Sequence, residues 1–155
     1  MRILFLHGYG SQPGGIKPAF LRDRGHEVLN PALPAEDFAE SMRIAQQAFD
    51  DGKPDVVVGS SRGGAVAINI DTGGVPLVLI APAWKRWGTA TMVKPAVTIL
   101  HSANDELIPI DDSRELLRPS RLPEERLVVV GAEHKMVDAA ARQALLEAVE
   151  KTGQQ

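Results

Sequence analysis

The sequence contains no cysteine, and this absence excludes disulfide bonds, thiolate nucleophiles and zinc sites built on cysteine. It also has no excess of positive charge, because 17 Lys and Arg residues stand against 20 Asp and Glu, for a net charge of −3. Such a balance offers little to neutralise a phosphate backbone or to attract the protein to anionic lipid. We therefore expect neither nucleic acid nor a membrane as a partner.

No apolar segment approaches the roughly 20 residues that a membrane-spanning helix needs. The N-terminal run Ile3–Leu6 is also too short for a signal peptide, and a glycine-containing turn follows it at once. These absences favour a cytoplasmic protein. With 44% hydrophobic and 24% charged residues, and without repeats or linkers, residues 1–155 predict a single globular domain in which only residues 152–155 fray.

Short apolar runs and helical patterns alternate along the chain. The apolar runs are nearly continuous, which is typical of parallel strands buried on both faces. Strands are predicted at 3–6, 56–58, 77–80, 97–100 and 127–130, with a weaker one at 26–29, and helices at 39–49, 63–70, 112–117 and 138–149. This order predicts an α/β fold: a three-layer sandwich with a mostly parallel central sheet.

One strand leads into a motif that carries chemistry. Residues 56–65 read as a buried strand, then Gly59-Ser60-Ser61-Arg62-Gly63, then a helix rich in small residues. The G-x-S-x-G pattern in this context is typical of a nucleophile elbow, where glycines avoid collisions across the turn and the central serine projects above the sheet. Ser61 is therefore the candidate nucleophile, and the N–H of Arg62 is a candidate donor to an oxyanion. The motif alone also occurs by chance in loops rich in Gly and Ser.

The loop after the first strand, residues 7–11, is His-Gly-Tyr-Gly-Ser. An oxyanion hole needs a second backbone N–H from a turn beside the elbow, and the N–H of Tyr9 is the candidate. A plain glycine turn is the alternative.

An acidic residue follows a late strand and can orient a histidine. Asp105 lies in the loop after residues 97–101, and we assign it this role. Glu106, Asp111 and Asp112 are its rivals, although the last two fit better at the start of a helix, where carboxylates complement the helix dipole. A solvated loop carboxylate is the alternative.

The candidate general base is His134, in the loop between the last strand and the last helix. From there, one ring nitrogen can contact Ser61 and the other Asp105. The other three histidines fit less well: His7 belongs to the oxyanion loop, His26 precedes a weak strand, and His101 ends a strand where a structural hydrogen bond is expected. The resulting order Ser, Asp, His is the order of one particular fold.

These motifs resemble the α/β-hydrolase superfamily over nearly the whole chain. The resemblance is carried by residues 7–10, 59–64, 105–109 and 133–134, and the Gly-Ser-Ser-x-Gly-Gly form with the short length is similar to the small YqiA-like esterases. It implies hydrolysis of small-molecule esters or thioesters through an acyl-enzyme. The elbow lacks the glycine and lysine pattern of a phosphate-binding loop and the sequence has no cluster of metal ligands, so no metal and no organic cofactor are expected. The resemblance does not identify the substrate or the oligomeric state.

The chain departs from many members of that superfamily after the strand that ends at Ile80. Only residues 81–96 precede the next strand, so a helical cap is minimal or absent and we expect an open, shallow site for small or exposed acyl groups. Trp84, Trp87 and Met136 are candidate substrate-binding residues near the site, with Tyr9 as a similar one. Simple packing of the loop onto the sheet is an equal alternative.

Other functions use the same fold. A non-catalytic module that binds a small molecule or a protein is one, because fold does not fix function. An acyltransferase, in which another acceptor replaces water, is a second. Cleavage of thioesters or C–C bonds also remains open, since it uses the same groups.

Overall fold

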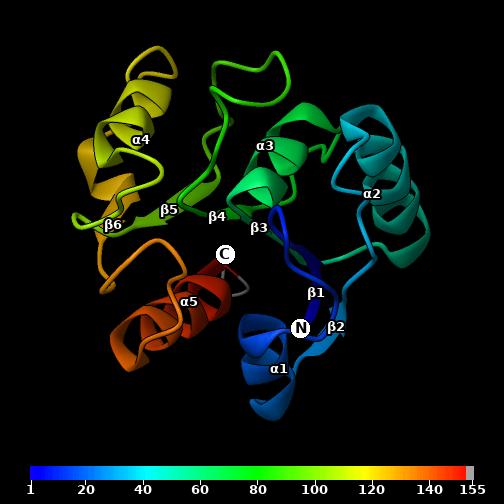
Figure 1. Ribbon diagram of the computed structural model, residues 1–155. Coiled ribbons are helices and arrows are strands. Elements are labelled where there is room, and N and C mark those ends of the chain that lie inside the picture. The colour runs from blue at the N-terminus through cyan, green and yellow to red at the C-terminus, as the bar shows by residue number, and fades with distance from the viewer. Residues whose placement is uncertain (153–155) are drawn as a thin grey trace.

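The computed structural model describes residues 1–152, and these form one six-stranded sheet covered by helices on both faces (Figure 1). The strand order is β2-β1-β3-β4-β5-β6, and every neighbouring pair is parallel. The strands are β1 (Arg2–Leu6), β2 (Glu27–Leu29), β3 (Val56–Ser60), β4 (Leu77–Ile80), β5 (Val97–His101) and β6 (Leu127–Val129). The predicted three-layer α/β architecture is confirmed, with a sheet that is fully parallel.

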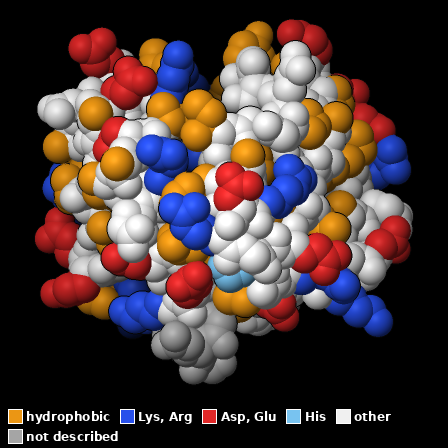
Figure 2. All heavy atoms as spheres, turned by 90° about the horizontal axis from the view of Figure 1, so that it is seen from below, with side chains coloured by type: hydrophobic (Ala, Val, Ile, Leu, Met, Phe, Trp, Pro, Cys, Tyr) orange, Lys and Arg blue, Asp and Glu red, His pale blue; other side chains and the backbone are white. Residues whose placement is uncertain are grey.

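The helices lie in two layers. On one face are α1 (Ile16–Asp23) and α5 (Ala139–Thr152), and on the other are α2 (Phe38–Gly52), α3 (Arg62–Asn69) and α4 (Ile110–Leu117), with a short 3₁₀ turn at Glu124–Arg126. Figure 2 shows the α1–α5 face from outside, where acidic and basic side chains are interspersed. Asp138 accepts the N–H of Ala141 at 3.2 Å, so it helps to cap α5 as predicted.

The continuous apolar runs form two cores because successive strand residues point to opposite faces. On β1, Ile3 and Phe5 belong to the cluster under α1 and α5, whereas Leu4 and Leu6 belong to the cluster under α2, α3 and α4. All four are at most 2% exposed. The edge strand β6 is more open, because Val128 is 37% exposed and Val129 53%.

Helix α1 was not predicted from the sequence. The two glycines at 14 and 15 and Pro18 indicate a loop there. Pro18 instead lies in the first turn of α1, where backbone N–H groups have no acceptor within the helix, so the missing N–H of proline costs nothing. Phe20 and Leu21, one turn later, are buried in the core. The predicted fraying is wrong for Thr152, which ends α5, and residues 153–155 lie outside the described part of the chain.

The strand order determines where a ligand can bind. From β1 the chain first moves outward to β2 and then returns to the other side of β1 to place β3, so the direction of winding reverses between β1 and β3. In open parallel sheets, ligands bind outside the carboxyl ends of the strands at such a reversal. The loops that begin at His7 and Ser61 follow β1 and β3 at this point.

The connection from β4 to β5 is short. Residues 81–96 form neither a helix nor a strand there, so this connection carries no helical cap, in line with the minimal or absent cap that the sequence predicts. None of the helices within residues 1–152 has both the length and the apolar character to span a bilayer.

Two glycines allow α3 to approach the sheet closely. A Cβ on Gly63 would overlap the carbonyl group of Leu6 on β1 and lie 2.8 Å from the carbonyl oxygen of His7. A Cβ on Gly59 would lie 2.8 Å from the Cα of Gly64 across the turn. The predicted collision across the turn is therefore correct for Gly59, whereas Gly63 is required by the neighbouring strand β1.

We expect Gly63→Ala to lower the free energy of unfolding by at least about 3 kcal/mol, because backbone atoms of β1 and α3 must separate to admit the methyl group. Gly74→Ala is the matched control, since a Cβ there meets no atom within 4 Å. Urea unfolding monitored by circular dichroism measures both. Equal stability of the two variants would contradict this account.

Candidate active site

Ser61 occupies a strained turn between β3 and α3. Its backbone dihedral angles are φ 54° and ψ −113°, which lie outside the regions that residues with a Cβ normally adopt. The surroundings hold it there: its N–H donates to the carbonyl of Ile80 at 2.8 Å, and its carbonyl accepts the N–H of Ala83 at 3.0 Å. Strain of this kind costs about 1–3 kcal/mol and is found mainly at functional sites. The turn is the elbow that the sequence predicted.

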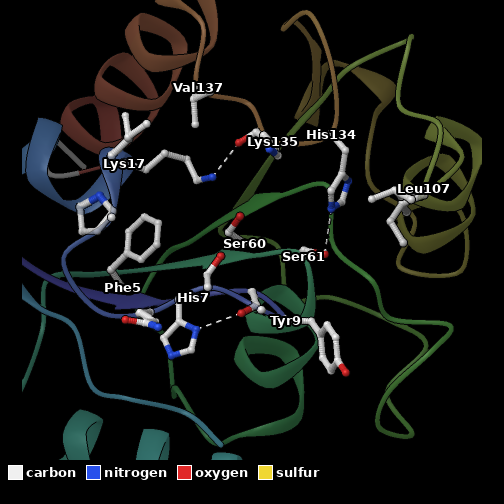
Figure 3. A pocket seen from close by; sticks show the side chains of 18 of the residues that line it. Phe5, His7, Tyr9, Lys17, Ser60, Ser61, Leu107, His134, Lys135 and Val137 are labelled. Atoms are coloured by element: carbon white, nitrogen blue, oxygen red, sulfur yellow. Dashed lines mark hydrogen bonds between the residues drawn. The ribbon is translucent and has the colours of Figure 1, made fainter. Parts of the chain in front are cut away.

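His134 links Ser61 to Asp105. Its Nε2 lies 3.1 Å from Ser61 Oγ, and its Nδ1 lies 2.6 Å from Asp105 Oδ2. The three side chains come from loops after β3, β5 and β6. Asp105 and Ser61 are 29 and 73 positions away from His134 in the sequence, and they meet it at one edge of the sheet. Figure 3 shows the imidazole of His134 above the Ser61 hydroxyl. The structure therefore brings together the three residues that the sequence assigned to nucleophile, acid and base.

The carboxylate of Asp105 is fully buried but well supplied with donors. Its Oδ1 accepts the N–H groups of Leu107 and Ile108, each at 2.8 Å. Burial alone would raise the pKa of Asp105, but these hydrogen bonds and the one from His134 outweigh burial and hold the pKa below its usual value. An ionised Asp105 only accepts, so Nδ1 of His134 carries the proton and Nε2 is left free to accept the hydroxyl hydrogen of Ser61.

Behind Asp105 lies a fully buried histidine, His101. His101 Nε2 is 2.9 Å from the carbonyl of Ile108 and 3.2 Å from Asp105 Oδ2, and its Nδ1 is 2.7 Å from Ser113 Oγ. A carbonyl can only accept, so Nε2 carries the proton and Nδ1 accepts from Ser113. Burial lowers the pKa of His101, against the opposing effects of the Ile108 carbonyl and Asp105. The expected structural hydrogen bond of His101 is thus present, and it supports the loop that holds Asp105.

The rival acids are engaged elsewhere. Asp111 pairs with Arg114 at 2.6 Å, and Asp112 pairs with Lys85 at 3.1 Å, both on α4 or its surroundings. Glu106 is exposed to solvent.

The rival bases are also occupied. The N–H of Leu33 donates to His7 Nε2 at 2.9 Å, so the His7 proton is on Nδ1, which lies 2.9 Å from the carbonyl of Gly8. His26 precedes β2 at the opposite edge of the sheet and lies 3.2 Å from Glu150.

Two backbone N–H groups flank Ser61. Gly8 lies against the elbow, because a Cβ there would be 3.3 Å from Ser61 Cβ, and Tyr9 follows it. Arg62 is the first residue of α3, whose N-terminus carries a partial positive charge. Within residues 1–152 neither the N–H of Tyr9 nor that of Arg62 donates to another protein group. Both are therefore free to bind an oxygen of a ligand.

The Arg62 side chain is buried and contacts residues around the elbow. It is 1% exposed, donates to the carbonyl of Pro34 at 2.9 Å, and places its guanidinium 5.7 Å from the ring centre of Trp87. Trp87 in turn stacks on Tyr9, with ring centres 6.1 Å apart. Burial lowers the pKa of Arg62, and the charges of Glu36 and Asp37 oppose that shift.

A pocket of about 430 Å³ opens beside Ser61 and His134. This is the size range of small-molecule sites. Trp87 and Tyr9 line it, as the sequence predicted, but Trp84 and Met136 do not. Trp84 turns away because its Nε1–H donates to the carbonyl of Asp112 at 2.8 Å and its ring packs in the core under α4. Met136 is 2% exposed and belongs to the core under α1 and α5.

Several lining residues were not predicted from the sequence. Among them, Phe5, Ile16 and Val137 add apolar wall, and Lys17, Arg86 and Lys135 add positive charge. Ile16 and Lys17 belong to α1, the helix that was not recognised, so their position could not be argued. Their place shortly after the first strand, at the carboxyl edge of the sheet, was the available signal.

Among residues 1–152, no three His, Asp or Glu side chains are grouped as metal ligands would be.

We expect the free energy of unfolding of Ser61→Gly to exceed that of Ser61→Ala by about 1–2 kcal/mol, because glycine adopts this φ without strain. The larger conformational entropy of glycine in the unfolded chain offsets part of the gain. Both variants lack the hydroxyl, so the comparison isolates the backbone. Chemical denaturation measures it. If Ser61→Ala were the more stable, the turn would not be strained.

His101 predicts a pH dependence of stability. Burial depresses its pKa from the ordinary 6.5, so below that pH the unfolded chain takes up a proton that the folded protein does not. The free energy of unfolding therefore falls as pH drops below about 6.5. In His101→Gln this contribution is absent, and the slope of unfolding free energy between pH 7 and pH 5 becomes shallower. Parallel slopes in denaturation titrations would contradict it.

No protein-family model matches the sequence, and no curated protein matches it significantly. Solved structures do match. Mouse α/β-hydrolase domain-containing protein 10 has a TM-score of 0.72 at 18% identity, over 97% of this chain and 88% of that one. MGS-MChE2, an α/β-hydrolase enzyme from a lagoon-sediment metagenome, gives 0.70 at 17%, over 97% and 91%. The esterase domain of a Rhodothermus marinus protein gives 0.60 at 17%, over 99% and 84%. The chain therefore has the α/β-hydrolase fold, in a small form without a helical cap after β4.

Proposed function

We propose that this protein is a serine hydrolase that cleaves carboxylic esters, and thioesters by the same route, through an acyl-enzyme on Ser61. One observation carries the proposal: the continuous hydrogen-bonded series from Ser61 Oγ through His134 to the buried carboxylate of Asp105. A serine hydroxyl is a weak nucleophile, and an adjacent oriented base is what activates it. The hydrolases and the esterase domain among the similar structures support the same reading.

Each group has a role that follows from its contacts. Ser61 Oγ attacks the ester carbonyl while His134 Nε2, 3.1 Å away, takes its proton. Asp105 holds the imidazole in the tautomer that can accept this proton and stabilises the imidazolium that results. His134 then protonates the leaving alcohol, and water that it activates releases the acid from Ser61.

The negative charge that develops on the carbonyl oxygen needs donors already in place. The N–H groups of Tyr9 and Arg62 supply them, since both lack a protein acceptor and the second lies at the positive end of α3. Both are backbone groups beside the elbow, so their positions do not depend on the rotamer of a side chain.

The pocket indicates the size of the substrate. A volume of about 430 Å³ fits a small ester, and no cap covers the site after β4. Trp87 and Tyr9 form one wall and Phe5 and Val137 contribute apolar surface elsewhere. We infer that small or exposed acyl groups are the substrates.

Labelling with a fluorophosphonate tests the activated serine without knowledge of the substrate. We expect one adduct on wild type, mapped to Ser61, and none on Ser61→Ala. Ser60→Ala is the matched control, because Ser60 is the adjacent serine of the same pocket and the hydrogen bond from His134 goes to Ser61; this variant should still be labelled. Intact mass and peptide mapping give the result. A folded wild type that stays unlabelled would refute the proposal and favour a non-catalytic binding module.

A further inference from the structure

The charge of the pocket is opposite to that of the whole protein. Although acidic residues exceed basic ones, 20 to 17, the twenty residues that line the pocket include Lys17, Arg86 and Lys135 and no Asp or Glu. All of these residues lie in the part of the chain that the structure describes. Asp105 does not alter this balance at the surface of the pocket, because its side chain is fully buried behind His134.

Of the three cations, Lys17 is the one directed into the pocket. It extends from α1 and donates from Nζ to the carbonyl of Lys135 at 2.7 Å (Figure 3). The side chains of Lys135 and Arg86 are at the exposed rim, and Arg86 is held there by the carbonyl of Leu107. Lys17 and Ser61 face the same cavity from different sides.

The ammonium group of Lys17 has unused capacity. It carries three N–H donors, and within residues 1–152 only the one directed at the Lys135 carbonyl has a protein acceptor. Burial lowers the pKa of Lys17 to about 8, and no carboxylate of the described residues opposes that effect. A partly buried cation without a counter-ion binds an anion favourably, because pairing offsets the desolvation that the protein has already imposed.

We propose that the substrate is an ester that also carries a carboxylate, and that Lys17 pairs with this carboxylate when the ester carbonyl lies at Ser61. The inference rests on the proposed function and narrows its substrate class. Phe5, Ile16 and Val137 line the pocket together with Lys17 and Ser61 and provide an apolar path for the short carbon chain between the two ends. A half-ester of a short dicarboxylic acid has this form.

Lys17 could instead act only as a structural link, because its bond to Lys135 connects α1 to the loop that carries His134. A loosened His134 would slow the cleavage of every ester by the same factor. A lost ion pair slows only the charged one. The ratio of kcat/KM for a charged ester and its neutral analogue therefore separates the two roles.

The test uses substrate pairs that differ only in charge. Monoethyl succinate and monoethyl adipate are each compared with the corresponding ω-amide ester, which has nearly the same shape and no charge. A second arm compares 3-acetoxypropionate with its amide and places the carboxylate on the alcohol side of the scissile bond. Release of ethanol or acetate, followed by chromatography, gives kcat/KM.

We expect wild type to prefer the charged member of at least one pair by about tenfold or more, the value of a charge-assisted hydrogen bond. The arm in which the preference appears identifies the side of the ester that reaches Lys17. Lys17→Met should abolish the preference by lowering kcat/KM for the charged ester alone. Lys17→Arg should retain most of the preference. Lys94→Met is the matched control, because Lys94 also donates to a backbone carbonyl at 2.7 Å but lies away from the pocket.

The proposal is overturned if no charged ester is preferred by wild type, or if the preference survives Lys17→Met. These outcomes leave fluorophosphonate labelling of Ser61 intact. Failure of the proposed function is distinguishable from these outcomes, because Ser61 would then stay unlabelled and neither the charged nor the neutral esters would be cleaved. A folded, labelled Lys17→Met protein that cleaves the neutral ester as wild type does, and the charged ester no faster than the neutral one, supports the proposal.

Discussion

The turn at Ser61 depends on how closely α3 can approach the sheet. A helix that begins immediately after a buried strand must pack directly on the neighbouring strand, and the carbonyl of Leu6 occupies the space where a side chain at Gly63 would be. This contact forces Ser61 into its left-handed conformation, which points the hydroxyl away from the sheet and places the first N–H of α3 beside it. The same contact brings the turn after β1, with Gly8 and Tyr9, against Ser61. One steric requirement thus positions the nucleophile and both candidate donors to an oxyanion.

Around this turn, negative charge lies in the interior and positive charge lines the pocket. The carboxylate of Asp105 is buried but stabilised by N–H donors from its own loop and by two histidines. His134 transmits its influence to the hydroxyl of Ser61, which faces the cavity. Beyond it, the charged residues that line the pocket are all cations, and Lys17 is the partly buried one among them, with no carboxylate of the described residues beside it. Negative charge is therefore kept behind the reacting atoms, and the space in front of them suits an anion.

A comparison of sequence and structure shows which features are local. The continuous apolar runs predicted a parallel sheet because strands buried on both faces need no polar alternation. Four loops at the ends of those strands then carried the residues at positions 9, 61, 105 and 134, and parallel strands place all such loops at one edge. The motif around Ser61 is local in the same sense, since its glycines are required by contacts within a few residues and with the adjacent strand.

What only the tertiary structure decided concerns side chains whose neighbours are distant in sequence. Trp84 and Met136 were predicted near the substrate from their place in loops, yet hydrogen bonding to α4 draws one into a core and the packing of α1 and α5 buries the other. Helix α1, and with it Lys17, was missed because its N-cap, Gly15, has no capping side chain and its first turn has no acidic residue, so this eight-residue helix is stabilised mainly by packing. The order of strands and loops in the sequence determines the edge of the sheet at which these groups gather. The packing of helices that are far apart in the sequence determines which side chains face the pocket.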